Sequence, residues 1–194
     1  MRIILASKSP RRKELLSKRF KDFEVIVSEA DESIPAGILP EEGVALIAER
    51  KGQAVYRKIC CEMGEEYANS SLIISSDTLV EIDGDPLGKP RDKADAYSMI
   101  ERLSGKAHCV RTGVAVSLGG KSEKGTATTK VYFKKLDHET IENYVSSSEP
   151  YDKAGAYGIQ GAAGEFVENI EGDYDTVVGL SMALVEKLVE KVTR

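Results

Sequence analysis

The chain has 194 residues, of which 41% are hydrophobic and 30% are charged, a size and composition typical of one globular domain. Its formal net charge is −5 at pH 7, so there is no overall positive field to bind a nucleic-acid polymer. The cysteines Cys60, Cys61 and Cys109 lack C-x-x-C spacing, which argues against a disulfide framework and a structural zinc site.

The apolar N-terminal residues 1–6 are followed at once by Ser7-Lys8-Ser9-Pro10-Arg11-Arg12. Such a run is too short for a signal or membrane-spanning segment. We therefore expect a cytoplasmic protein without a membrane partner.

The elements are predicted from apolar periodicity and from the residues that begin and end helices. Apolar, β-branched runs bounded by turn residues indicate strands, and apolar residues at helical spacing after a capping residue or proline indicate helices. In chain order these are a strand at residues 2–6, a helix from Pro10, a helix from Pro40 through Ile59, a strand at residues 72–82, a helix between Asp92 and Gly105, a hairpin of residues 110–118 and 130–133 about Gly119-Gly120, a helix at residues 137–145, a strand at residues 166–167 and a helix from Asp175 through Val192. This order predicts an α/β fold, a mixed central β-sheet with flanking helices. No linker or repeat interrupts residues 1–194, which we expect to form a single domain.

The first candidate site is the polar cluster between the first strand and the first helix. Free backbone N–H groups and the helix dipole favour an anion at this position. Two arginines in the first turn oppose the dipole unless a phosphate binds between them and the amides. The cluster therefore predicts a phosphate site that includes Ser7, Ser9, Arg11 and Arg12. The alternative is a solvated turn in which Ser9 only caps the helix.

Two carboxylates and two lysines are further candidates. Asp77 lies in an apolar strand, and a buried carboxylate is costly unless it is paired or binds a metal. It would suit a Mg²⁺ site or a general base, with Glu32 as a second carboxylate. Lys51 and Lys89 offer cations for phosphate. The alternatives are a solvent-facing Asp77, a solvated Glu32 and a Lys51 side chain that extends along an apolar face to water.

The segment of residues 152–164 contains too many glycines for regular structure. Within it, Gln160 offers a donor and an acceptor to the edge of a base, and the alternative is an exposed amide in a turn. His108 and His138 lack partners at ligand or triad spacing, and no nucleophile-elbow or Walker motif occurs. The remaining cations, carboxylates and helix N-terminus suit phosphoanhydride hydrolysis with a divalent metal and an activated water.

Taken together, the motifs resemble the Maf (septum-formation) family of nucleotide pyrophosphatases. In family order across nearly the whole chain, these motifs are Ala-Ser-Lys-Ser-Pro-Arg-Arg, Ser-Asp-Thr-Leu-Val, Leu-Gly-Lys-Pro, Leu-Ser-Gly-Lys-Ala-His, Asp-Lys-Ala-Gly-Ala-Tyr-Gly-Ile-Gln-Gly and Glu-Gly-Asp-Tyr-Asp-Thr-Val-Val-Gly-Leu. The resemblance implies two lobes around a long cleft, a shape related to inosine triphosphate pyrophosphatases and often a homodimer. It also implies dependence on a divalent metal, Mg²⁺ or Mn²⁺, held by Asp77 and Glu32.

The resemblance also assigns roles by position. Asp77 matches the family's proton acceptor and Glu32 its partner carboxylate, while Lys51 and Lys89 match lysines that line the triphosphate site. Ser9 and its neighbouring arginines match the family's phosphate-binding start.

The substrate group follows from three further positions. Family members that act on dTTP and UTP carry arginine, threonine and glutamine where this chain has Arg11, Thr78 and Gln160. The resemblance therefore implies a nucleoside triphosphate pyrophosphatase for dTTP and UTP, with modified pyrimidine nucleotides as further substrates. Its implied cellular roles are cell-division arrest and exclusion of modified nucleotides from nucleic acids.

Two places depart from the family pattern. Ser76 stands where alanine or glycine is more usual, and Gly179-Leu180-Ser181 lacks the customary proline after leucine. Two other functions use the same residues. One is a regulator of cell division that binds the nucleotide without hydrolysing it, and the other is a phosphatase that releases single phosphates.

Overall fold

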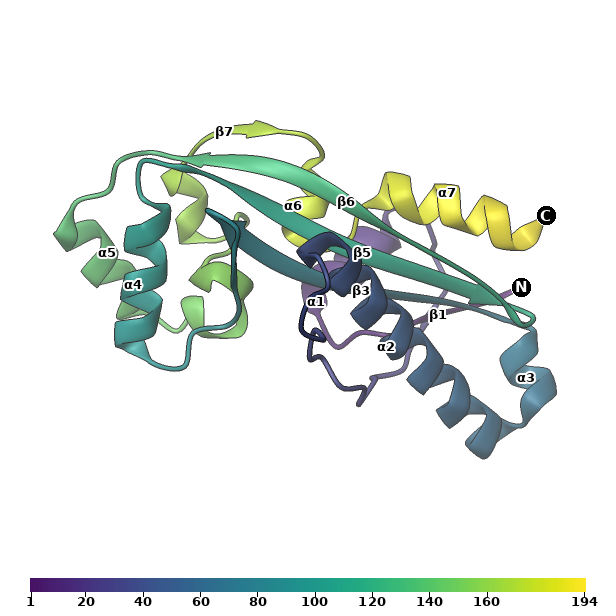
Figure 1. The fold of residues 1–194 in the computed structure, drawn as a ribbon. Coiled ribbons are helices and arrows are strands. Elements are labelled where there is room, and N and C mark those ends of the chain that lie inside the picture. Colours follow the sequence, from purple (N-terminus) through teal and green to yellow (C-terminus); the bar gives the residue numbers. More distant parts are fainter. The chain divides into compact units, whose positions relative to one another are not determined.

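The computed structural model describes all 194 residues and has helices on a mixed β-sheet (Figure 1). Its elements are β1 (Arg2–Leu5), α1 (Pro10–Ser17), β2 (Glu24–Val25), α2 (Pro40–Met63), α3 (Glu65–Asn69), β3 (Ser71–Ile82), β4 (Asp85–Leu87), α4 (Lys93–Leu103), β5 (Ala107–Leu118), β6 (Lys121–Phe133), α5 (His138–Val145), the 3₁₀ turns η1 (Pro150–Asp152), η2 (Ala154–Ala156) and η3 (Ala162–Phe166), β7 (Val167–Glu171), α6 (Tyr174–Val178) and α7 (Met182–Thr193).

The sheet has the strand order β2-β1-β3-β5-β6-β7, with β4 paired to β3. β1 pairs in parallel with β2 and β3, whereas the β3–β4 and β6–β7 pairs are antiparallel. The predicted mixed sheet with flanking helices is confirmed. The predicted hairpin is also present: Gly119 and Gly120 both have positive φ, as the type I′ turn of a two-residue hairpin loop requires. None of the helices combines the length and the hydropathy that spanning a lipid bilayer would need.

The chain divides into two compact units. Unit 1 contains residues 1–77, 112–127 and 179–194, and unit 2 contains residues 78–111 and 128–178. The single domain over residues 1–194 and the two lobes around a cleft stay predictions.

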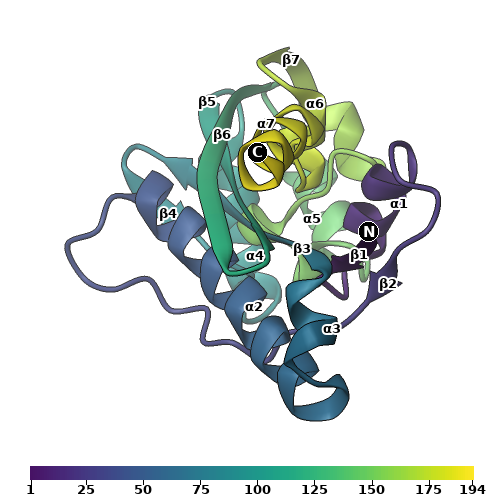
Figure 2. The ribbon, with the colours of Figure 1, turned by 90° about the vertical axis from the view of Figure 1, so that its right-hand side faces the viewer.

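Within unit 1, α2 covers one face of the sheet and α7 the other (Figure 2). Pro40 at the first position of α2 and two glutamates in its first turn suit a helix N-terminus. The helix lies close to the sheet because small residues face it. The Ser75 hydroxyl of β3 donates to the Ala48 carbonyl at 2.6 Å. At Gly113 of β5, an added Cβ would overlap the Val44 carbonyl group and lie 2.6 Å from the Ala45 nitrogen.

We expect Gly113→Ala to lower the free energy of unfolding by about 3 kcal/mol. The overlapping atoms belong to the α2 backbone, so no side-chain rotation can relieve the clash. The matched control is Gly125→Ala in β6, where the nearest atom is the flexible Leu184 Cδ1 at 3.3 Å, and where we expect a change within about 1 kcal/mol. Urea denaturation measures both variants. Equal stabilities would contradict this account of the packing of α2 on β5.

Unit 2 has its own apolar core, in which α4 packs against α5 and the η2 turn. Aromatic rings meet edge to face at its centre. Phe133 contacts Tyr157 with ring centroids 4.9 Å apart and His108 with centroids 5.0 Å apart. His108 is only 2% exposed, its Nε2 shares a 2.7 Å hydrogen bond with the Tyr157 hydroxyl, and its buried Nδ1 has no hydrogen-bond partner. The histidine is therefore a core residue of unit 2.

Burial lowers the pKa of His108 from 6.5 to about 4, which makes stability depend on pH. Between these values the unfolded chain takes up a proton that the folded chain does not. The stability that neutral His108 contributes is fully present above pH 6.5 and is lost as the pH falls to about 4. At about 1.4 kcal/mol per pH unit, the free energy of unfolding falls by about 3 kcal/mol over this range. We expect urea denaturation at pH 7, 5.5 and 4.5 to show a weaker pH dependence for His108→Gln than for the native chain. His138→Gln, at an exposed histidine, is the control, and identical pH dependence in all three proteins would refute the prediction.

The expectation of one C-terminal helix from Asp175 through Val192 is wrong. The structure has α6 and α7, separated at Gly179, whose φ is 124°. Helical φ is negative, and residues with a Cβ rarely adopt this value. Ser181 then caps α7 by accepting a hydrogen bond from the Leu184 N–H at 3.4 Å.

Candidate active site

Three charged side chains meet in unit 1, from elements far apart in the sequence. Lys51 of α2 places its ammonium 2.7 Å from Asp77 Oδ1 on β3 and 2.9 Å from Glu32 Oε1, in the segment before α2. Lys51 is 8% exposed, while the Asp77 and Glu32 side chains are 16% and 57% exposed. Asp77 thus does not face solvent as an edge residue, and the Lys51 ammonium does not extend to water.

Within this cluster, Lys51 is the most buried residue and Glu32 the most exposed, and the one cation lies between two anions. A buried ammonium needs a partner, because transfer of an unpaired charge from water is costly. The pair with Asp77 supplies that partner and also fixes the direction of the carboxylate. Glu32 approaches from the solvent side. The cluster therefore presents an oriented carboxylate and a cation to a ligand that arrives from the Glu32 side.

The carboxylates Asp77 and Glu32 were predicted to hold a divalent metal. No group of three or more His, Cys, Asp or Glu side chains is placed to do so by itself. Mg²⁺, however, commonly uses only one or two carboxylates and fills its other positions with water and substrate phosphate oxygens. The two carboxylates fit this mode of binding, in which a metal ion would share them with the Lys51 ammonium.

The predicted phosphate site forms a capped turn in unit 1. Ser9 caps α1 and accepts a hydrogen bond from the Arg12 N–H at 3.4 Å. The Ser9 N–H donates to Ser7 Oγ at 3.2 Å, and Ser7 is buried. Arg11 is half-buried in the first turn of α1. The cap is thus present, and the role of this turn in phosphate binding stays a prediction.

Arg12 also connects elements of unit 1. Its Nε donates to the Gly179 carbonyl at 2.8 Å and its Nη1 to the Ser76 carbonyl at 2.7 Å. Burial lowers the pKa of Arg12, and the negative charge of Asp77 opposes this effect. Because Ser76 directly precedes Asp77, Arg12 fixes the strand next to the charged cluster.

The departure at Ser76 contacts the segment that carries the other departure, residues 179–181. The Ser76 hydroxyl donates to the Gly179 carbonyl at 2.9 Å, the same oxygen that accepts from Arg12. Ser181 supplies the cap of α7 at the end of the same turn. The serine before Asp77 therefore forms a hydrogen bond to the turn between α6 and α7.

The other predicted residues, Thr78, Lys89 and Gln160, belong to unit 2. Thr78 is half-buried on β3, while Lys89 and Gln160 are exposed. The segments that carry Lys89 and Gln160 are joined, because the Gly155 N–H donates to the Gly88 carbonyl at 2.9 Å. An added Cβ at Gly155 would lie 2.9 Å from the Val80 side chain, so this close approach requires glycine.

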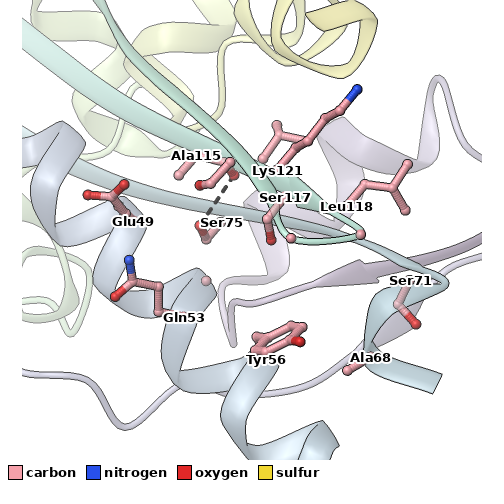
Figure 3. A pocket seen from close by; sticks show the side chains of 15 residues that line it. Glu49, Gln53, Tyr56, Ala68, Ser71, Ser75, Ala115, Ser117, Leu118 and Lys121 are labelled. Carbon is pink, nitrogen blue, oxygen red and sulfur yellow. Dashed lines mark hydrogen bonds between the residues drawn. The ribbon is translucent and has the colours of Figure 1, made fainter. Parts of the chain in front are cut away.

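A pocket of about 240 Å³ lies in unit 1 between α2 and the β5–β6 hairpin (Figure 3). Gln53 and Tyr56 point toward it from α2, and Ser117 and Leu118 border it from the hairpin. Ser75 also lines it, but its hydroxyl is engaged with the Ala48 and Ala115 carbonyls. None of the predicted site residues lines this pocket.

Known proteins similar to this chain share its length as well as its sequence. The dTTP/UTP pyrophosphatase of Thermococcus gammatolerans is 46% identical over 188 residues, which are 97% of this chain and 95% of that protein. The proteins of the same name from Clostridium botulinum strain Loch Maree and Bacillus cereus strain AH187 are 48% and 44% identical, and cover 93% and 96% of this chain and 91% and 94% of their own lengths.

Among solved structures, the Staphylococcus aureus Ham1 protein matches with a TM-score of 0.45 and 16% identity, over 69% of this chain and 72% of that one. The model of the Maf-like protein family matches residues 2–192, and so includes every residue placed above. With this match and relatives at 44–48% identity, the chain belongs to the Maf family.

Proposed function

We propose that the protein is a nucleoside triphosphate pyrophosphatase that hydrolyses dTTP and UTP to the monophosphate and pyrophosphate. The observation that carries the proposal is the cluster of Lys51, Asp77 and Glu32, with the ammonium 2.7 and 2.9 Å from the two carboxylates. It occurs in a chain 40–48% identical to proteins named dTTP/UTP pyrophosphatase. A half-buried, oriented carboxylate beside a cation is the arrangement that water activation at a polyphosphate requires.

In the proposed reaction, Asp77 orients a water molecule and accepts its proton as the water attacks the α-phosphorus. Lys51 holds the Asp77 carboxylate in place, so the base does not need to reorganise during the step. Arg11, Arg12 and Lys89 compensate charge on the triphosphate, and pyrophosphate leaves without a covalent intermediate. A divalent metal, Mg²⁺ or Mn²⁺, held by Asp77 and Glu32 supplies further charge neutralisation when bound.

Gln160 is the proposed reader of the base. The edge of thymine and uracil offers a carbonyl acceptor beside an N–H donor, which matches the N–H₂ donor and the carbonyl acceptor of one amide. Cytosine presents the reverse pattern, which pairs with the amide only in its flipped orientation. Ser7, Ser9 and Thr78 complete the proposed substrate contacts, and modified pyrimidine nucleotides with the same edge are further substrates.

The cellular part of the proposal follows from the sequence and the family resemblance. We place the enzyme in the cytoplasm, as a homodimer that acts without nucleic acid or membrane partners. Its cellular purpose would be to remove modified pyrimidine nucleotides, or to arrest cell division by lowering nucleotide levels. Light scattering of the purified protein tests the homodimer.

A substrate panel tests the function. Purified protein with Mg²⁺ or Mn²⁺ is incubated separately with dTTP, UTP, dCTP, dATP and 7-methyl-GTP, and the products are separated by ion-exchange chromatography. We expect monophosphate and pyrophosphate from dTTP and UTP, at rates well above those for the other nucleotides. Preference for 7-methyl-GTP would overturn the assignment of Gln160 as the residue that reads the base. An absence of product from every nucleotide would overturn the proposed enzymatic activity.

A further inference from the structure

The glycine-rich segment that carries Gln160 has little regular structure of its own. Between the 3₁₀ turns η2 and η3, residues 157–161 form no helix or strand. Gln160 itself is exposed. A residue that recognises a base must be held in place by its surroundings, because ordering a free loop on binding costs affinity. The contacts that hold this segment therefore bear on recognition.

Glu149, which lies directly before η1, holds the segment on its C-terminal side. Its Oε2 accepts a hydrogen bond from the Ala162 N–H at 3.0 Å, two residues after Gln160. Its Oε1 accepts from the Tyr144 hydroxyl at 3.2 Å. Tyr144 is 6% exposed and stacks edge to face on Phe166. The carboxylate thus ties the backbone next to Gln160 to the core of unit 2.

Two glycines of the segment lie close to Glu149 or to a side chain that contacts it. An added Cβ at Gly161 would lie 2.5 Å from Glu149 Cδ and 2.6 Å from its Oε2. An added Cβ at Gly158 would lie 2.6 Å from the Cε of Lys153, whose ammonium donates to the Glu149 carbonyl at 2.5 Å. The chain therefore passes closest to the Glu149 carboxylate at Gly161, where a side chain would displace it. A side chain at Gly158 would displace the Lys153 side chain instead.

The N-terminal side of the segment is held separately. The Tyr157 hydroxyl shares its 2.7 Å hydrogen bond with the buried His108, and the Gly155 N–H donates to the Gly88 carbonyl. With this side already fixed in the core, Glu149 supplies the side-chain contact that closes the turn after Gln160.

We propose that Glu149 is a positioning residue for base recognition, and that its carboxylate places Gln160 by fixing the turn of residues 158–162. This proposal rests on the proposed function, because base reading by Gln160 comes from there. Glu149 itself touches no reacting atom. Its loss should therefore affect recognition of the base more than the chemical step.

The test compares Glu149→Ala with Glu149→Gln, which keeps one oxygen acceptor at nearly the same volume. For Glu149→Ala we expect the KM for dTTP to rise about tenfold and the preference for dTTP over dCTP to fall about tenfold, with kcat changed by less than about threefold, as expected for lost binding of the base. Hydrogen exchange at the Ala162 amide should be about tenfold faster or more. Glu149→Gln should restore most of the preference for dTTP and most of the protection of the Ala162 amide from exchange. Glu165→Ala, at an exposed glutamate of η3, is the matched control.

Native values of both dTTP preference and Ala162 exchange in Glu149→Ala would overturn the proposal. So would an equal loss of kcat/KM for dTTP and dCTP, because that pattern indicates a structural role alone. An inactive native protein would overturn the proposed function, and with it the proposed recognition of the base by Gln160. Hydrogen exchange separates the two failures, since it reports the Glu149 contact without any nucleotide.

Discussion

Asp77→Asn is expected to abolish turnover of dTTP, with kcat reduced by about 10³-fold or more. The amide has the shape of the carboxylate but cannot accept a proton from water or neutralise a metal ion. The fold should be preserved, because Lys51 keeps its ion pair with Glu32 at 2.9 Å. We therefore expect the dissociation constant for dTTP, measured by calorimetry without added metal, to stay within about threefold of the native value.

The control for this variant is Asp83→Asn. Asp83 is exposed and has a φ of 55°, a conformation that asparagine also tolerates. It should keep native turnover. Retention of more than about a tenth of native kcat in Asp77→Asn would contradict the role of Asp77 as the base.

Lys51→Met should lower kcat/KM for dTTP by about 10²-fold. Methionine keeps the buried stem of Lys51, which is 8% exposed, but removes the cation shared by Asp77 and Glu32. The two carboxylates then repel the triphosphate. In the absence of nucleotide they should also bind Mn²⁺ about tenfold more tightly, because the ammonium no longer competes for them. Electron paramagnetic resonance of free Mn²⁺ measures this affinity apart from activity.

Lys58→Met, at an exposed lysine of the same helix, is the matched control and should change neither property. Unchanged Mn²⁺ affinity in Lys51→Met would show that the ammonium does not compete with a metal ion at these carboxylates. Unchanged kcat/KM for dTTP would show that Lys51 has no role in catalysis.

The core of the fold could be predicted from the sequence where a local pattern determines it. Apolar periodicity and capping residues gave α2, β3 and the β5–β6 hairpin, since each of these elements is long and strongly patterned. The break between α6 and α7 was not predicted, because apolar residues continue at helical spacing on both sides of Gly179. The φ of 124° at Gly179 is set by its surroundings in the fold. The strand β2 has two residues and α3 has five, too few for a periodic signal.

The candidate site could be predicted as a set of residue types but not as a geometry. Lys51 and Asp77 are 26 residues apart, and the sequence left open whether each of them faced solvent. The contacts of Arg12 with the Gly179 and Ser76 carbonyls join residues separated by 167 and 64 positions. Only the folded chain brings such groups together.

Glu149 was missed because nothing in its immediate sequence marks it as an acceptor for a backbone N–H thirteen residues away. The available signal was indirect. Gly158 and Gly161 flank Gln160, and glycines in such a pattern indicate close approach of the backbone to another group. The pattern predicts that something lies close, but it does not name the partner.

Hydrolysis of dTTP in water labelled with oxygen-18 shows whether the enzyme is a pyrophosphatase, because it reports which bond breaks and which phosphorus water attacks. We expect labelled dTMP and unlabelled pyrophosphate, measured by mass spectrometry after a single turnover with Mg²⁺. Formation of dTDP with labelled phosphate would contradict it and indicate a phosphatase. Bound dTTP recovered without any product would contradict it in favour of a nucleotide-binding regulator.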